Sequence, residues 1–216
     1  MLKSKITSKK RVTDHGEVFT SEREVNAMLD LVKQETERID SRFLEPACGD
    51  GNFLSEILIR KLKIVNSRYG KSQKELDKYS LVAISSIYGI ELLNDNVKKC
   101  VDRLFKIYIE WYKVVSEKQE NDKLFRCVKF VLSKNIIQGD ALTLKTVGNI
   151  EKPIIFSEWS FTQNMVKRRG FSFDELLKNQ GIRETPLFSD LGDDVFLPQT
   201  IEEFPMVHYL ELADNV

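Results

Sequence analysis

The sequence predicts an α/β protein with a doubly wound, mainly parallel sheet and helices on both of its faces. Two observations predict this class. Short apolar runs of strand length alternate along the chain with longer segments in which apolar residues recur at helical spacing. Acidic residues directly follow three of these runs, as they can where parallel strands end beside a ligand crevice. The expected strands are residues 43–44, 81–90, 135–139 and 153–156.

The length and composition fit one domain with an extension. The chain has 216 residues, of which 42% are hydrophobic, and this is enough for a sizeable core. We expect a basic, poorly ordered arm over residues 1–14, a domain over 15–180 and an acidic extension over 181–216. No Lys or Arg follows Arg183, so the extension is a solvated tail or, alternatively, a regulatory or DNA-mimicking one.

The overall charge, the lack of long apolar runs and the cysteine spacing limit the partners, location and metal or disulfide sites to be expected. Lys plus Arg (33) balances Asp plus Glu (33), so the overall charge argues neither for nor against nucleic acid. No apolar run approaches the length of a transmembrane helix and none follows the basic start, which predicts a cytoplasmic protein without membrane contact. The three cysteines, Cys48, Cys100 and Cys127, lie far apart without CxxC spacing, so neither disulfides nor a zinc or other metal site is expected.

Caps and apolar periodicity predict the first helices. Ser21 followed by Glu24 has the spacing of a capping box, and the apolar residues after it predict a helix to about residue 38. A second helix, to about residue 65, is expected after the first strand, and residues 66–72 break its pattern. A short charged helix or a loop then leads to the second strand.

Two more helical patterns separate the second strand from the third. The first begins near Asp95 or Asn96 and is expected to end near Glu117. The second contains apolar residues at helical spacing over 125–132, and we expect it to pack beside the first.

The sequence pattern predicts less regular secondary structure in the last quarter of the chain. Ser172 and Glu175, at capping-box spacing, predict a helix over residues 171–179. Residues 182–205 contain three prolines and a glycine and are expected to be irregular, and residues 206–212 are expected to add one edge strand.

The stretch over residues 43–53 is the most informative part of the sequence. It reads Phe-Leu-Glu-Pro-Ala-Cys-Gly-Asp-Gly-Asn-Phe, a strand, a glycine turn and a helix start. Gly49 and Gly51 allow the backbone to approach a ligand and present amide groups to it, although two glycines are also ordinary turn chemistry. Because Glu45 and Asp50 make this turn acidic, it favours a cationic ligand over a dinucleotide phosphate.

Three successive strands are expected to end in acids at one edge of the sheet. Glu91 at the second tip is placed to accept hydrogen bonds from a ribose diol, and Asp140 at the third to accept from an adenine amino group. Glu45 or Asp50 could meet the amino end of an amino-acid moiety. The alternative is that these acids are exposed loop residues.

Residues 43–53 resemble the first cofactor motif of S-adenosylmethionine-dependent methyltransferases, in the form typical of N6-adenine DNA methyltransferases of bacterial restriction–modification systems. Residues 18–21 resemble the family's other methionine-side motif, which usually ends in Thr-Pro. Residues 88–91 and 139–142 resemble its next two cofactor motifs. The resemblance spans residues 15–161 and implies a Rossmann-like class I methyltransferase fold that binds S-adenosylmethionine.

The resemblance also implies a role for each matched residue. Phe19 and Thr20 would line the methionine end of the cofactor, Glu91 would hold its ribose, and Asp50 would face the sulfonium side through water. The residues implied at the methionine pocket are Glu45, Ala47, Gly49 and Gly51. Asp140 is implied at the adenine, and Ala141 beside it is a further cofactor-binding candidate.

The catalytic motif of that family, Asn/Asp-Pro-Pro-Tyr/Phe, has no clear counterpart. It is expected directly after strand 153–156, where the chain has Ser-Glu-Trp-Ser-Phe instead. In the family the Asn or Asp and a carbonyl orient the target amino group, and the aromatic residue stacks on the flipped base. Ser157, Glu158 and Phe161 are therefore the catalytic candidates, although Glu158 is longer than the expected residue and the rigid prolines are absent.

Three functions remain open at this stage. The motif order places target recognition after catalysis, but about fifty-five residues follow Phe161, so a separate specificity or partner subunit would supply it. The first reading is thus a DNA adenine-N6 methyltransferase with a diverged motif, contacting DNA through Lys167, Arg168 and Arg169 unless these form a solvated turn. The second is an inactive interaction or regulatory subunit, and the third a methyltransferase for a non-DNA acceptor.

Overall fold

The computed structural model describes residues 20–117, 120–174 and 199–214. Phe19, the expected arm over residues 1–14 and most of the expected helix over residues 171–179 lie outside these ranges. The described segments contain no helix with the length and hydrophobicity of a membrane span.

The N-terminal helix begins as the capping box predicts. In α2 (Glu22–Leu31) the Ser21 hydroxyl accepts from the backbone N–H of Glu24, and the Glu24 carboxylate accepts from the backbone N–H of Ser21. The chain leaves helical geometry at Val32, and a short α3 (Lys33–Thr36) follows, so the single helix expected to residue 38 is two helices. Val25 and Leu29 are the buried residues of α2.

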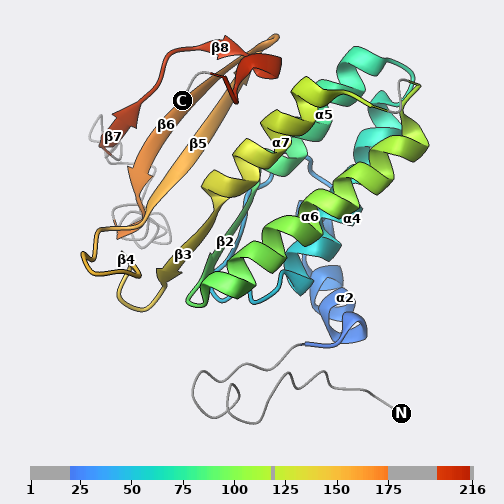
Figure 1. Ribbon diagram of the computed structural model, residues 1–216. Helices are drawn as coiled ribbons and strands as arrows, with labels where there is room; N and C mark the ends of the chain where they lie inside the picture. The colour runs from blue at the N-terminus through green and yellow to red at the C-terminus, as the bar shows by residue number, and fades with distance from the viewer. Residues whose placement is uncertain (1–19, 118–119, 175–198, 215–216) are drawn as a thin grey trace, which may run out of the picture.

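A parallel sheet forms the centre of the molecule, in the order β1-β2-β3-β4 (Figure 1). The first three strands are parallel, and β4 (Lys145–Thr146) pairs antiparallel with β3. The parallel strands are β1 (Phe43–Glu45), β2 (Ile87–Glu91) and β3 (Ile136–Asp140). The helices between them are α4 (Asn52–Tyr69), α5 (Gln73–Ser85), α6 (Asn94–Val115) and α7 (Asp122–Asn135). A mixed α/β architecture with a parallel sheet is therefore confirmed.

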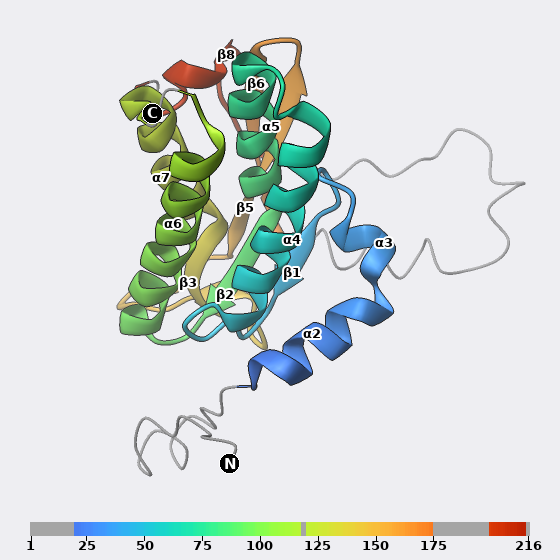
Figure 2. The same cartoon turned by 90° about the vertical axis from the view of Figure 1, so that its right-hand side faces the viewer.

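Helices α4 to α7 lie together on one face of this sheet (Figures 1 and 2). The core between them is built from fully buried Leu, Ile and Val side chains and from three thiols, while Tyr108 and Tyr112 fill the space between α6 and its neighbours. The expectation of two long helical patterns between the second and third strands, packed side by side, is confirmed by α6 and α7.

The expected strand over residues 81–90 is wrong in its first half. Leu81–Ser85 are the C-terminal end of α5, which begins after the Ser72 cap, and β2 starts only at Ile87. Leu81 and Ile84 are buried on a helix that also buries Leu76 and Ser80. A short continuous apolar run fits a buried helix as well as a buried strand, so periodicity alone does not separate the two.

The expected fourth parallel strand is also wrong. Instead of stopping before Ser157, the chain continues as β5 (Ile155–Thr162), which forms an antiparallel hairpin with β6 (Met165–Ser172). The two-residue turn uses Gln163 in the left-handed region, with φ 54°. Two further short strands pair with β6, β7 (Thr200–Glu203) and β8 (Val207–His208), and the 3-10 helix η1 (Tyr209–Glu211) follows. Part of the region expected to be irregular and part of the expected edge strand thus extend this second sheet.

Strand β5 crosses the parallel sheet on the face opposite the helices. Alternate side chains of a strand point to opposite faces, and a side chain at Gly89 would meet Leu54 of α4, so Tyr88 faces away from the helices. The Tyr88 hydroxyl donates to the Ser157 carbonyl at 2.8 Å. The described residues therefore place helices α4–α7 on one face and a β-hairpin across the other, and the predicted helices on both faces are not observed in them.

Candidate cofactor site

The glycine turn between β1 and α4 depends on its two glycines. Gly49 and Gly51 have φ of 54° and 90°, values that residues with a Cβ rarely adopt. A Cβ on Gly51 would lie 2.7 Å from the Cys100 Sγ on α6. The turn can therefore bring its backbone this close to α6 only with glycine at position 51.

Glu91 fixes this turn against the tip of β2. Its Oε2 accepts from the backbone N–H of Gly49 and its Oε1 from that of Leu93, both at 2.9 Å, and the residue is 8% exposed. Each carboxylate oxygen can accept a second hydrogen bond. The residue implied at the ribose thus already orders the glycine turn, and it retains acceptor capacity toward a ligand.

The first strand brings Glu45 to the same edge. Glu45 pairs in register with Gly89, and the backbone N–H of Cys48 donates to the Ile90 carbonyl at 2.9 Å, which continues the parallel pairing past the strand end. Burial raises the pKa of Glu45, opposed by a hydrogen bond from the Ala47 backbone. A cationic ligand beside Glu45 would relieve that cost of burying a charge.

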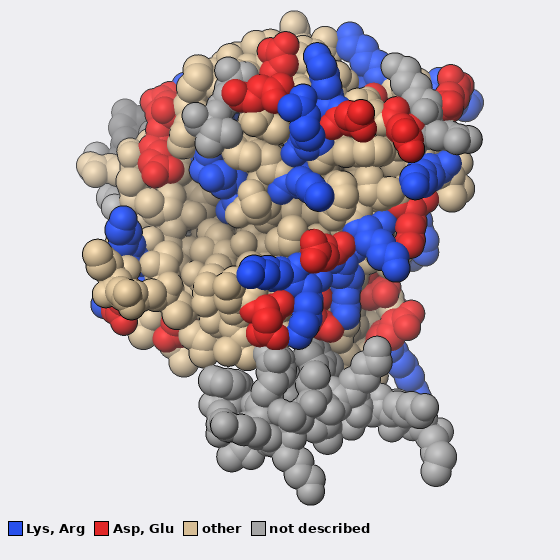
Figure 3. All heavy atoms as spheres, viewed as in Figure 1, with Lys and Arg blue, Asp and Glu red and all other residues tan. Residues whose placement is uncertain are grey.

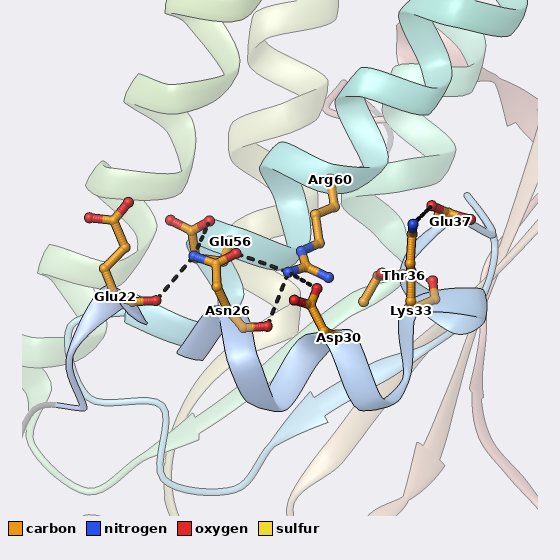
Figure 4. A network of polar contacts seen from close by, with 8 residues as sticks. All are labelled: Glu22, Asn26, Asp30, Lys33, Thr36, Glu37, Glu56 and Arg60. Carbon is orange, nitrogen blue, oxygen red and sulfur yellow. Dashed lines mark hydrogen bonds and ion pairs between the residues drawn. The ribbon is translucent and has the colours of Figure 1, made fainter. Parts of the chain in front are cut away.

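The N-terminal helix places Thr20 beside the turn. The Asn52 side-chain amide donates to the Thr20 carbonyl at 3.4 Å. Helix α2 is held on α4 by Arg60, whose guanidinium donates to the Asn26 side chain at 2.9 Å and to Asp30 at 2.7 Å (Figure 4). Thr20 and the glycine turn, far apart in sequence, are thus adjacent.

Asp50 at the centre of the turn has a partner that the sequence did not indicate. Arg103 of α6 donates to Asp50 Oδ2 at 2.5 Å and also contacts the Asn52 side chain. Asp50 Oδ1 is buried without a hydrogen-bond partner among the described residues. Because 53 residues separate Asp50 from Arg103, no local pattern could have paired them.

The third strand ends beside the second. Glu91 pairs in register with Gln138, so Asp140 and Ala141 extend just beyond Glu91 along the sheet edge. Asp140 Oδ1 accepts from the backbone N–H of Leu142 at 2.8 Å, which holds this carboxylate at the tip of β3. The described cofactor candidates therefore gather at one edge, and whether they bind a cofactor stays a prediction.

The catalytic candidates lie away from that edge, within β5. Glu158 forms ion pairs with Arg42, which directly precedes β1, at 2.9 Å and with Arg169 of β6 at 2.6 Å. Burial raises the pKa of Glu158, but the two arginines outweigh it and hold that pKa below its usual value. Ser157 Oγ accepts from Arg168 at 2.9 Å. The structure thus places Ser157, Glu158 and Phe161 in a paired strand and not in the expected turn after a parallel strand.

The basic cluster expected to touch DNA has internal partners. Lys167 pairs with Glu203 and Arg169 with Glu158, while the Arg168 guanidinium lies 4.1 Å from the centre of the Phe204 ring. On the molecular face that Figure 3 shows, Lys and Arg side chains alternate with Asp and Glu. The described part of this face therefore presents mixed charge instead of a basic patch.

The comparisons match the first part of the chain. The family model described as MmeI, DNA-methyltransferase domain, matches residues 19–153. No curated protein and no solved structure gave a significant match. The matched range contains every cofactor candidate, from Phe19 to Ala141, and it ends before β5 and the catalytic candidates.

Proposed function

Because the chain belongs to the family of the MmeI DNA-methyltransferase domain, we propose that the edge around the glycine turn binds S-adenosylmethionine. The observation that carries this proposal is the set of hydrogen-bond acceptors at that edge: Glu45, Glu91 and Asp140 surround the turn, and Asp50 Oδ1 is buried without a partner in the described structure. The cofactor presents an ammonium group, a ribose diol and an adenine amino group, all of them donors. The hydrogen-bond acceptors at this edge of the protein therefore match these donor groups of the cofactor.

Each group has a place in this proposal. Glu91 accepts from the ribose hydroxyls with the lone pairs that Gly49 and Leu93 leave unused, and Asp140 with Ala141 holds the adenine. Glu45, Ala47 and Thr20 surround the methionine end together with Phe19, which lies outside the described residues. Arg103 neutralises Asp50, so Glu45 is the acid that attracts the cationic end of the ligand.

When bound, S-adenosylmethionine supplies an electrophilic methyl group. We propose that the acceptor of this group is N6 of adenine in DNA. We also propose that the protein acts in a restriction–modification system in the cytoplasm. Ser157 and Glu158 are engaged by arginines and lie toward the strand starts, which favours a structural role for them. We therefore propose that the groups that orient the target base lie outside residues 157–161, in another segment or in a partner subunit. An inactive regulatory subunit is the second candidate, and the same ion pairs favour it.

Titration calorimetry with S-adenosylmethionine and its demethylated product tests the cofactor site. We expect measurable binding that weakens about tenfold or more in Glu45→Gln and Glu91→Gln, since each removes a charged acceptor. Glu151→Gln is the matched control, because Glu151 is exposed and paired with Lys145 on the β4 side of the molecule. No heat with either ligand, or equal loss in the control, would contradict the proposal.

A methyl-transfer assay with labelled cofactor on DNA, RNA and protein then separates the candidates. Labelled N6-methyladenine in DNA supports the enzyme, and labelling of RNA or protein alone redirects the proposal to another acceptor. Cofactor binding without transfer supports either the regulatory subunit or an enzyme that needs a partner subunit to orient the target base.

A further inference from the structure

A cavity of about 680 Å³ opens at the sheet edge opposite the glycine turn. Arg42, which precedes β1, and Ser85 and Ser86, which precede β2, line it. The parallel strands start at this edge and end at the cofactor candidates, and the five residues of β2 span about 16 Å. The cavity is therefore separate from the proposed cofactor site, and a methyl donor held at the glycine turn could not reach into it.

The lining of this cavity is basic. Four cations, Arg38, Arg42, Arg68 and Lys78, face it together with one carboxylate, Asp40. Arg38 and Arg42 also pair with Glu35 and Glu158. Within the described ranges, Arg68 has no ion-pair partner. Positive charge thus remains available to an anion at the Arg68 and Lys78 side.

Aromatic rings lie beside these cations. Tyr69 and Tyr79 are stacked with ring centres 3.7 Å apart and planes 11° from parallel, and Lys78 Nζ lies 5.2 Å from the centre of the Tyr79 ring. Trp159 and Phe161 of β5 line the same cavity. Phe161 is the residue that the sequence predicts to stack on a base, and it lines this cavity and not the edge proposed to bind the cofactor.

Cations interleaved with aromatic faces are the chemistry that binds single-stranded nucleic acid, with phosphates on Arg or Lys and bases stacked on the rings. The cavity volume lies within the range of sites for small organic groups. Bases within a duplex are already stacked on their neighbours, whereas an unpaired base can enter a pocket. We propose that this cavity binds an unpaired nucleotide of a single strand, with Arg68 and Lys78 at the phosphate and Tyr79 and Phe161 at the base.

Fluorescence anisotropy with a short labelled DNA strand of mixed sequence tests this proposal in the full chain. The variant Arg68→Ala/Lys78→Ala removes two lining cations from α4 and α5. Lys63→Ala/Lys74→Ala is the matched control, because it removes two exposed cations from the same helices that do not line the cavity. The same strand annealed to its complement shows whether a duplex binds as well as a single strand. Free deoxyadenosine monophosphate, added as a competitor, shows whether one nucleotide is enough for binding.

We expect the single strand to bind about tenfold more weakly to Arg68→Ala/Lys78→Ala and within about twofold of the unmodified chain in the control. In Arg68→Ala/Lys78→Ala, the slope of log affinity against log salt concentration should become shallower by about 1.4. Each of the two lost phosphate contacts on a single strand contributes about 0.7. Phe161→Leu should weaken strand binding with the salt slope unchanged, because stacking releases no counterions. Competition by the mononucleotide supports recognition of one base and its phosphate.

Equal loss in the two double variants, no binding of strand or mononucleotide, or tighter binding of the duplex would overturn the proposal. Calorimetry with S-adenosylmethionine on the same variants keeps this outcome distinct from the proposed function, because none of the four mutated cations lies at the cofactor edge. A loss of cofactor binding with strand binding intact would count against that function alone.

Discussion

At the glycine turn, the carboxylate of Glu91 is held by backbone amides, whereas in the β5–β6 hairpin the carboxylate of Glu158 is held by arginine side chains. Glu91 accepts from Gly49 and Leu93, and Glu158 is paired with Arg42 and Arg169. A backbone-held acid keeps its negative charge for a ligand, while a doubly arginine-paired acid has its charge neutralised. Of these two predicted site residues, Glu91 can thus still attract a ligand with its charge, whereas the charge of Glu158 is already compensated by arginines.

The difference separates the edge proposed to bind a ligand from the hairpin, whose acid is paired within the fold. At the turn, one carboxylate oxygen of Asp50 is buried and unpaired in the described structure, and Gly51 has a conformation that only glycine adopts readily. In the hairpin, the Ser157 hydroxyl and both Glu158 oxygens have partners. The strongest tests therefore address residues at the turn, and the weakest expected effect lies in the hairpin.

Glu91→Ala should have the largest effect. It leaves the N–H groups of Gly49 and Leu93 without their acceptor, and at about 1–3 kcal/mol each the expected loss of unfolding free energy is about 2–6 kcal/mol. Urea denaturation measures it. Glu91→Gln keeps one carbonyl acceptor and should lose about half as much, because one of the two N–H groups keeps its partner. Unchanged stability in Glu91→Ala would show that Glu91 does not order the turn.

Local sequence was sufficient for the turn and the N-terminal cap. The strand, turn and helix over residues 43–53, and the Ser21 capping box, depend on residues within a few positions of one another, and both were predicted. A continuous apolar run does not show its own period, so the sequence predicts a strand over residues 81–85, where the structure has the end of α5.

Contacts between distant residues could not be predicted in this way. Arg103 lies 53 residues from Asp50, and Arg42 lies 116 residues from Glu158. No periodicity or motif links such pairs. The run over residues 153–156 is compatible with a parallel strand, and only its pairing with β6 makes it the start of a hairpin. For that reason residues 157–161 lie in a paired strand and not in the expected turn.

Gly51→Ala should have the second largest effect. The new Cβ would lie 2.7 Å from Cys100 Sγ at a φ of 90°, so we expect a loss of about 2–5 kcal/mol from left-handed backbone strain and overpacking together. Urea denaturation of Gly51→Ala, Cys100→Ala and the double variant separates these causes. If overpacking contributes, the double variant loses less than the sum of the single variants. Strict additivity would assign the whole loss to the backbone.

Glu158→Gln should have the smallest effect, and its pH dependence sharpens the contrast with Glu91. The two arginines hold the folded-state pKa of Glu158 below its unfolded value, so their stabilisation is present above the unfolded pKa and is lost as pH falls through the folded one. We expect the unfolding free energy of Glu158→Gln to be about 1–2 kcal/mol lower than that of the unmodified chain at neutral pH. This difference should become smaller as the pH falls. Thermal unfolding between pH 7 and acidic pH measures it.

The exposed pair of Glu151 with Lys145 supplies the control for that experiment, and Glu151→Gln should change stability by less than about 0.5 kcal/mol at neutral pH. Glu158→Gln should also leave S-adenosylmethionine affinity unchanged, because Glu158 lies toward the strand starts and the cofactor candidates lie at the strand ends. Weaker cofactor binding or reduced methyl transfer in Glu158→Gln, with stability preserved, would instead make the hairpin part of the active site. The contrast between a ligand edge and a structural hairpin would then fail.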